Sequence, residues 1–214
     1  MGRASVSVGR PRTERSRRGI LDAAAKLLKQ RGYTDVTIEG IAAEAGVAKT
    51  TVYRWWSSKA AIYIDLYAEL AAQIAPPPDT GDVAADLVSL VRGSARLYRR
   101  TAAGLALAGI IAEAQSNAQV SKLVRTVFVP SRRQVTLRIL ERAAQRGEIP
   151  GDVDLNLVSE IITGAVWYHV LAGAGPLTDT HAIRLVESIV RGIPVTNMAV
   201  ANAIDRKRAR LSAD

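Results

Sequence analysis

The chain has 214 residues, with 29 Lys and Arg residues against 20 Asp and Glu residues and a net charge of +9. This length allows one or two domains. Cysteine is absent, which excludes a disulfide framework and a thiolate metal site and fits a reducing cytoplasm, where we expect the protein to reside. The longest uninterrupted apolar run, residues 102–112, is too short to cross a bilayer, so no membrane span or membrane partner is predicted.

The chain begins with a segment, residues 1–14, that is rich in Arg, Ser, Gly and Pro. We expect this segment to be a disordered basic arm. No apolar run follows its arginines, so it does not have the form of a secretory signal. A helix is predicted over residues 15–31, and Gly32 is expected to end it. Its apolar residues recur at the spacing of one buried helical face: Ile20, Ala23, Ala24, Leu27 and Leu28.

Residues 37–59 predict two short helices joined by a tight turn. Thr37 is expected to cap the first of them, because its hydroxyl can accept from a backbone N–H that has no other partner. Gly46 lies where the chain must reverse and can adopt a left-handed conformation without a Cβ clash. The second helix, residues 48–56, has an exposed side without acidic residues: Lys49, Thr50, Thr51, Tyr53 and Arg54. Residues 15–59 are therefore predicted to form a helix-turn-helix domain whose second helix enters a DNA groove.

The positive charge is concentrated in the same part of the chain. Residues 1–60 contain 12 basic and 5 acidic residues, whereas the remaining residues contain 17 and 15. A basic patch beside a helix-turn-helix supplies affinity for phosphates in any DNA sequence. Arg17 and Arg18, in the first turn of their helix, are expected to bind phosphates. The arm before them is either a solvated tail or a contact in a neighbouring minor groove.

The string AGVAKTTVYRWWSSKAAI, from Ala45 to Ile62, resembles the signature of TetR-type (tetracycline-repressor-like) transcriptional regulators, and the resemblance extends over about 45 residues, 20–64. Ala48 stands where these proteins often have a Ser or Thr cap, which weakens the cap by about 1 kcal/mol. Thr50 replaces a frequent Gly, and Trp56 replaces a usual Phe. We expect Thr50 and Arg54 to contact bases, and Thr37, Tyr53 and Lys59 to hold phosphates of double-stranded DNA.

The rest of the chain is predicted to be helical. Ser57 or Ser58 is expected to cap a helix that ends near Ala75, before the linker formed by prolines 76–78. Further helices are expected at 82–99, 102–116, 119–147, 154–173 and 179–192, with a short one at 195–206, and Pro130 should kink or split the third. No segment alternates long enough to form a strand, so the fold class is all-α. Residues 60–194 form the predicted regulatory and dimerisation domain, and residues 195–214 the C-terminal tail.

The last two long helices have broad apolar stripes. These either close the core of the monomer or pair with a second copy. The resemblance implies pairing in a four-helix bundle, and a homodimer would place two recognition helices about 34–36 Å apart on a near-palindromic operator. The residues expected at this interface are Leu157, Ile161, Gly164, Ala165, Ile183, Val186, Ile189 and Val190.

The resemblance also implies a cavity for a small-molecule effector in the helical body. The sequence has no nucleotide-binding glycine motif, and no cofactor is predicted. Aromatic walls with a few polar groups suit such a pocket, although each of these residues could instead serve packing. The candidates are Tyr67, Tyr98, Glu113, Trp167, Tyr168 and His169.

An enzyme is not expected. His169 and His181 are the chain's two histidines and form no metal-binding HExxH pair, so no metal site is predicted. Glu113 has no identifiable carboxylate partner for acid–base chemistry. The sequence therefore predicts a ligand-responsive, homodimeric repressor, and the alternative is a helical partner- or ligand-binding protein that does not use its DNA-binding head for regulation.

Overall fold

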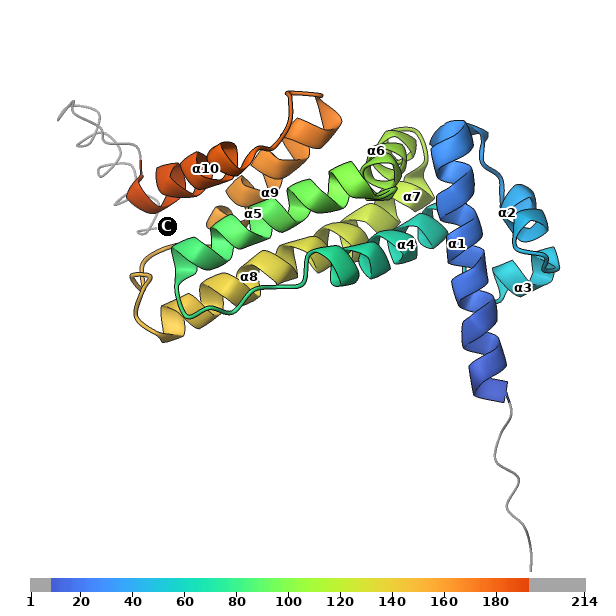
Figure 1. Cartoon of the computed structure of the whole chain (residues 1–214), viewed down its shortest axis with the longest axis horizontal. Coiled ribbons are helices and arrows are strands. Elements are labelled where there is room, and N and C mark those ends of the chain that lie inside the picture. Colours follow the sequence, from blue (N-terminus) through green and yellow to red (C-terminus); the bar gives the residue numbers. More distant parts are fainter. Residues whose placement is uncertain (1–8, 193–214) are drawn as a thin grey trace, which may run out of the picture.

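The computed structural model describes residues 9–192, and within them every regular element is a helix. The predicted all-α fold is confirmed. An N-terminal head contains α1 (Gly9–Asp35), α2 (Ile38–Glu44) and α3 (Lys49–Tyr53), and α4 (Lys59–Ile74) leads from it into the body. The body continues with α5 (Val83–Arg100), α6 (Ala103–Ala114), α7 (Ala118–Leu123), the π-helical turn η1 (Val124–Phe128), α8 (Val129–Gln145), α9 (Leu155–Leu171) and α10 (Asp179–Arg191). Figure 1 shows α2 and α3 at one end of the elongated molecule and α10 at the other.

The first helix is longer than the sequence predicts. It begins at Gly9 and not at residue 15, so residues 9–14 of the predicted disordered arm are helical. Gly32, with φ 74° and ψ 170°, breaks the helix where its end was expected, and a further turn continues to Asp35. Residues 1–8, the tail 195–214 and the short helix predicted at 195–206 lie outside the described residues.

The core of the head does not stop at α3. Side chains from α1, α2 and α3, such as Leu28, Ile41 and Val52, are buried in one cluster with Tyr63 of α4 and Leu107 of α6. Ser58 caps α4, because its hydroxyl accepts from the N–H of Ala61 at 3.2 Å. α4 therefore belongs to the head and the body at once.

Pro130 interrupts the α-helical hydrogen bonding of the long helix predicted over 119–147. The structure has α7, η1 and α8 in its place, and the N–H of Val129 bonds five residues back to the carbonyl of Val124. Proline has no N–H and clashes with the preceding turn of a helix, so a wider turn just before it relieves the conflict. The chain stays helical through this segment, so the predicted kink or split takes the form of one π-helical turn within a continuous helix, and Phe128 at the end of that turn is buried.

A second core lies at the far end of the body. Buried residues of α5, α8, α9 and α10 form it, among them Leu87, Ile139, Ile162 and Val186. No helix among the described residues is long and apolar enough to cross a membrane.

Candidate functional site

The turn between α2 and α3 has the geometry of a helix-turn-helix. The Thr37 hydroxyl accepts from the N–H of Gly40 at 3.0 Å and caps α2, as predicted. Gly46 has a φ of 64°, in the left-handed region that glycine adopts most readily. Ala48 begins α3 without a side-chain cap. These residues place α3 on the outside of the head.

The second helix presents one polar face to solvent. Lys49, Thr50, Tyr53 and Arg54 are exposed, and Thr51 is half-buried. Val52 and Trp56 lie on the other side and are buried in the head's core. The helix itself ends at Tyr53, earlier than the predicted residue 56. The structure thus brings the five predicted groove-facing residues together on one surface, and their contacts with DNA stay a prediction.

An acidic residue adjoins this surface. Glu39 of α2 forms an ion pair with Lys49, whose ammonium also lies 5.5 Å from the ring centroid of Tyr53. The hydrogen bond from Lys49 lowers the pKa of Glu39. The sequence reasoning considered acids only within the second helix and missed Glu39, although its place one residue after Ile38 on the first helix could have indicated it. A phosphate bound by Lys49 would have to compete with Glu39.

Lys59 is engaged inside the protein. Its ammonium donates to the backbone carbonyl of Tyr33 at 2.8 Å and lies 4.3 Å from the centroid of the Tyr33 ring. Burial lowers the pKa of Lys59, and Glu113 and Asp35 oppose this effect. A phosphate contact by Lys59 stays a prediction, and it would have to share the ammonium with the Tyr33 carbonyl.

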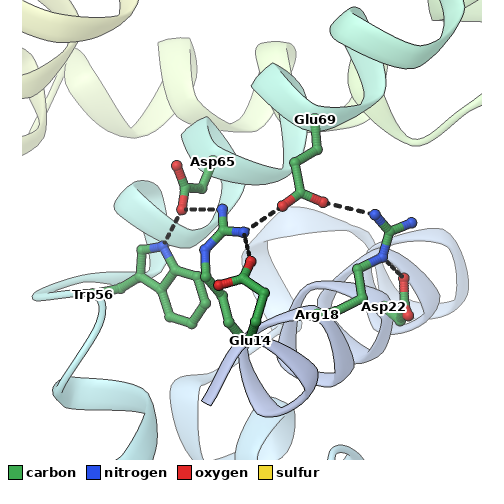
Figure 2. A network of polar contacts seen from close by, with 7 residues as sticks. Glu14, Arg18, Asp22, Trp56, Asp65 and Glu69 are labelled. Carbon is green, nitrogen blue, oxygen red and sulfur yellow. Dashed lines mark hydrogen bonds and ion pairs between the residues drawn. The ribbon is translucent and has the colours of Figure 1, made fainter. Parts of the chain in front are cut away.

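Arg17 and Arg18 also face the protein. The Arg17 guanidinium donates to Asp65 at 2.9 Å and to Glu69 at 2.6 Å, and Arg18 donates to the other oxygen of Glu69 at 3.0 Å. Figure 2 shows the two carboxylates reaching from α4 toward α1, with the indole N–H of Trp56 bound to Asp65.

Burial acts to lower the pKa of Arg17, but the hydrogen bonds to Asp65 and Glu69 raise it more. The phosphate role predicted for both arginines is untested, and in this conformation it would require release from α4. The sequence reasoning missed these two acids, which lie four residues apart and hence on one face of a helix. This spacing was the signal that could have identified them.

A cavity of about 210 Å³ lies among α4, α5, α8 and α9. Three of the six predicted ligand residues, Tyr67, Tyr98 and Trp167, line it. The hydroxyls of Tyr67 and Tyr98 are 2.5 Å apart, and burial raises the pKa of each, so both are protonated at neutral pH. The Arg132 guanidinium lies 5.1 Å from the ring centroid of Tyr67.

The other three predicted ligand residues lie elsewhere. Glu113 accepts a hydrogen bond from the Tyr33 hydroxyl at 2.7 Å and thereby joins α6 to the end of α1. Burial and this bond raise the pKa of Tyr33. Tyr168 is 62% exposed, and His169 is bonded to His181 outside the cavity. Successive residues of an α-helix project about 100° apart, so Trp167 lines the cavity while Tyr168 and His169 do not.

The predicted dimer residues divide between a surface and a core. Leu157, Ile161, Ile183 and Val190 are between 38% and 56% exposed, and Gly164 is exposed beside them. Ala165 and Ile189 are half-buried, whereas Val186 is 1% exposed and packs in the second core. Val186 therefore packs in the core of the monomer, which was one of the two alternatives that the sequence left open.

Two family models match the chain. "Bacterial regulatory proteins, tetR family" matches residues 20–66, and "Tetracyclin repressor-like, C-terminal domain" matches residues 77–189. The helix-turn-helix regulator YdeS of Bacillus subtilis (strain 168) is 32% identical over 88% of this chain and 95% of its own length. A DNA-binding transcriptional repressor, TetR, of Mycobacteroides abscessus is 30% identical over 80% of this chain and 90% of its own length.

A solved structure agrees with these matches. The TetR family transcription regulator SCO0332 has a TM-score of 0.73 and 33% identity, covering 84% of this chain and 99% of its own. Fold and site define a helix-turn-helix, DNA-binding regulator of transcription. The chain belongs to the TetR family.

The ion pair between Glu39 and Lys49 leads to a prediction about DNA affinity. Glu39→Gln frees the ammonium and removes a negative charge beside the phosphates, so we expect binding to duplex DNA up to roughly fivefold tighter. The salt dependence should steepen by about one released counterion. Fluorescence anisotropy on a labelled random duplex at several salt concentrations measures both quantities.

Glu44→Gln is the matched control. Glu44 ends the same helix and pairs with Lys26, away from α3, at 2.5 Å. Both substitutions change the net charge equally. Equal gains for the two variants would mean that net charge, and not release of Lys49, sets the affinity.

Proposed function

We propose that this chain is a homodimeric repressor that binds a near-palindromic operator and leaves it when a small anionic effector enters the body. The observation that carries the proposal is the exposed polar face of α3, held outward by the buried Val52 and Trp56 on its other side. Thr50 and Arg54 read bases, and Thr37 and Tyr53 hold phosphates. The protein acts in the cytoplasm and carries no catalytic activity.

The exposed apolar face of α9 and α10 supports the dimer. Leu157 and Ile161 lie one turn apart on α9, and Ile183 and Val190 two turns apart on α10, so each pair follows one side of its helix. The exposed Gly164 adds a place where a neighbouring helix can approach closely. Apolar side chains gathered in this way mark a protein–protein contact. A second copy, related by a two-fold axis, would cover them in a self-complementary interface.

The charge of the cavity supports an anionic effector. Arg132 and Arg138 are among its lining residues, and no carboxylate is. The remaining polar groups are the indole N–H of Trp167 and hydroxyls, such as those of Ser94, Thr136 and the Tyr67–Tyr98 pair. Because the Arg132 guanidinium is half-buried and a charge in such a place favours an opposite partner, the effector carries a carboxylate or phosphate next to an apolar or aromatic part. At about 210 Å³ the cavity suits a compact molecule.

One solved structure of the same fold holds a small-molecule ligand. The regulator FadR of Bacillus subtilis, with a TM-score of 0.62 and 22% identity, has a crystal structure in complex with stearoyl-CoA, a molecule with an apolar chain and an anionic head. Its sequence is too distant to suggest the same ligand here.

Selection from a pool of random duplex DNA tests the operator. We expect an enriched near-palindrome, and Arg54→Ala should weaken its binding by about tenfold or more while changing random DNA less, because a base contact is worth 1–3 kcal/mol. Arg125→Ala, an exposed arginine on η1, is the control. If no duplex is enriched at moderate salt, the result would favour the alternative, a helical partner-binding protein. If Arg54→Ala weakens binding to the selected and the random DNA equally, Arg54 does not contact a base.

The dimer is tested by one charge on its apolar face. Ile161→Glu places a carboxylate where two apolar surfaces meet, and we expect sedimentation equilibrium to show a shift from dimer to monomer at micromolar concentration, since an unpaired charge in an interface is costly. Leu105→Glu changes an equally exposed leucine on α6 and should leave the dimer intact. Monomeric wild-type protein, or dissociation by both variants alike, would refute the assigned face.

The effector class is tested by thermal stability in a library of small carboxylates and their uncharged methyl esters. We expect acids to raise the melting temperature of the wild type and of Arg125→Gln, because a ligand that binds only the folded state stabilises it. Arg132→Gln should lose most of that shift. Esters that stabilise as well as their acids would contradict an anionic effector without affecting the proposed operator.

A further inference from the structure

The chain's two histidines meet on the surface at the turn between α9 and α10. His169 lies near the end of α9 and His181 in the first turn of α10, 12 residues later. The intervening loop contains Gly173 and Gly175, both with positive φ, and reverses the chain. As a result, the two Nε2 atoms lie 3.0 Å apart, with the ring planes at 76°.

The backbone fixes which nitrogen of His169 is free. Its Nδ1 lies 3.0 Å from the carbonyl oxygen of Gly175. A carbonyl can only accept, so Nδ1 must carry the hydrogen, and in the neutral ring Nε2 is then a bare lone pair. His181 Nε2 lies 3.0 Å from this nitrogen. The backbone of His181 is fixed in turn, because its N–H donates to the capping hydroxyl of Thr178 at 3.1 Å.

The Nδ1 contact of His169 with a backbone carbonyl is of the kind that metal-binding imidazoles make. A ligating histidine usually donates its outer N–H to a carbonyl or carboxylate, which sets the tautomer and the orientation of the ring. Two nitrogens bound to one ion at 2.0–2.1 Å lie about 2.8–3.0 Å apart at a right angle and about 3.3–3.4 Å apart at a tetrahedral angle. The observed separation matches neighbouring positions of a square-planar or octahedral ion and is close to the tetrahedral value.

We propose that His169 and His181 together bind a late divalent transition metal: Ni²⁺, Cu²⁺ or Zn²⁺. Two neutral nitrogen donors without a carboxylate favour these ions over Mg²⁺ and Ca²⁺. Among residues 9–192, no group of three or more His, Cys, Asp or Glu side chains is placed to hold a metal. Water or another molecule therefore completes the coordination, and the ion is exchangeable.

The site is independent of the proposed effector. Neither histidine lines the cavity among α4, α5, α8 and α9. A bound ion would join the end of α9 to the start of α10, the two helices assigned to the dimer. The sequence reasoning dismissed a metal because it judged the histidines by their spacing along the chain, whereas the glycine-containing loop sets their distance in space.

The composition of the chain limits the side chains that could bind the metal elsewhere in a titration. With two histidines and no cysteine, the untagged protein has no other imidazole or thiol. Titration calorimetry with NiCl₂ should give one ion per chain, or one per two chains where a second copy completes the site. His169→Gln and His181→Gln should each weaken binding by about tenfold or more. Asp179→Asn, which removes an acid of the same turn of α10, should leave binding unchanged.

Imidazole NMR on the wild type gives a readout that does not depend on folding of the variants. Before metal, His169 should show the Nδ1–H form. On addition of ZnCl₂ the Nε2 resonances of both rings should shift together. Unmoved Nε2 resonances, or Ni²⁺ affinity retained in the double variant His169→Gln/His181→Gln, would show that the pair is an ordinary hydrogen bond and overturn the proposal.

Discussion

The helix α4 contributes both to the core of the head and to the cavity of the body, and the rest of the structure depends on this double role. Tyr63 lies wholly buried in the core of the head, and Tyr67, one turn later, lines the cavity of the body. Between them, Asp65 accepts from Arg17 of α1 and from the indole of Trp56, which follows the recognition helix. Because neighbouring turns of one helix move together, a displacement of α4 at the cavity must be accommodated at the contacts that hold the head.

The ion pairs between α1 and α4 are partly exposed, so their strength is intermediate between that of surface pairs and that of buried pairs. The side chain of Arg17 is 19% exposed, against 42% for Asp65 and 23% for Glu69, so the pairs are neither fully screened nor fully buried. Exposed pairs contribute little and buried ones are costly to break. A network between these limits would hold the head in the orientation described and would still permit the reorientation that the proposed effector response requires. An effector can favour that other orientation only by as much as it binds it more tightly.

The sequence predicted the features that local chemistry determines. Thr37, Gly46, Ser58 and Pro130 each act within a few residues, and the structure has their caps, turn and helix irregularity where they were expected. Contacts between distant segments were missed, because nothing in the local pattern marks them. Gly109 is an example: a Cβ there would lie 2.0 Å from Cγ of Tyr33, so α6 can approach the end of α1 only with glycine.

That close approach gives α1 a second anchor. In its first half, Arg17 is bound to α4; at its end, Tyr33 packs on Gly109 and donates to Glu113 of α6, while its carbonyl accepts from Lys59. A head held at one point could swivel, whereas one held at two separate points of a helix cannot turn without breaking contacts at one of them. Reorienting the head therefore requires breaking these hydrogen bonds to α4 and α6. The two arginines and the lysine predicted to hold phosphates already donate hydrogen bonds within the protein, so DNA would have to compete with the body of the protein for these cations.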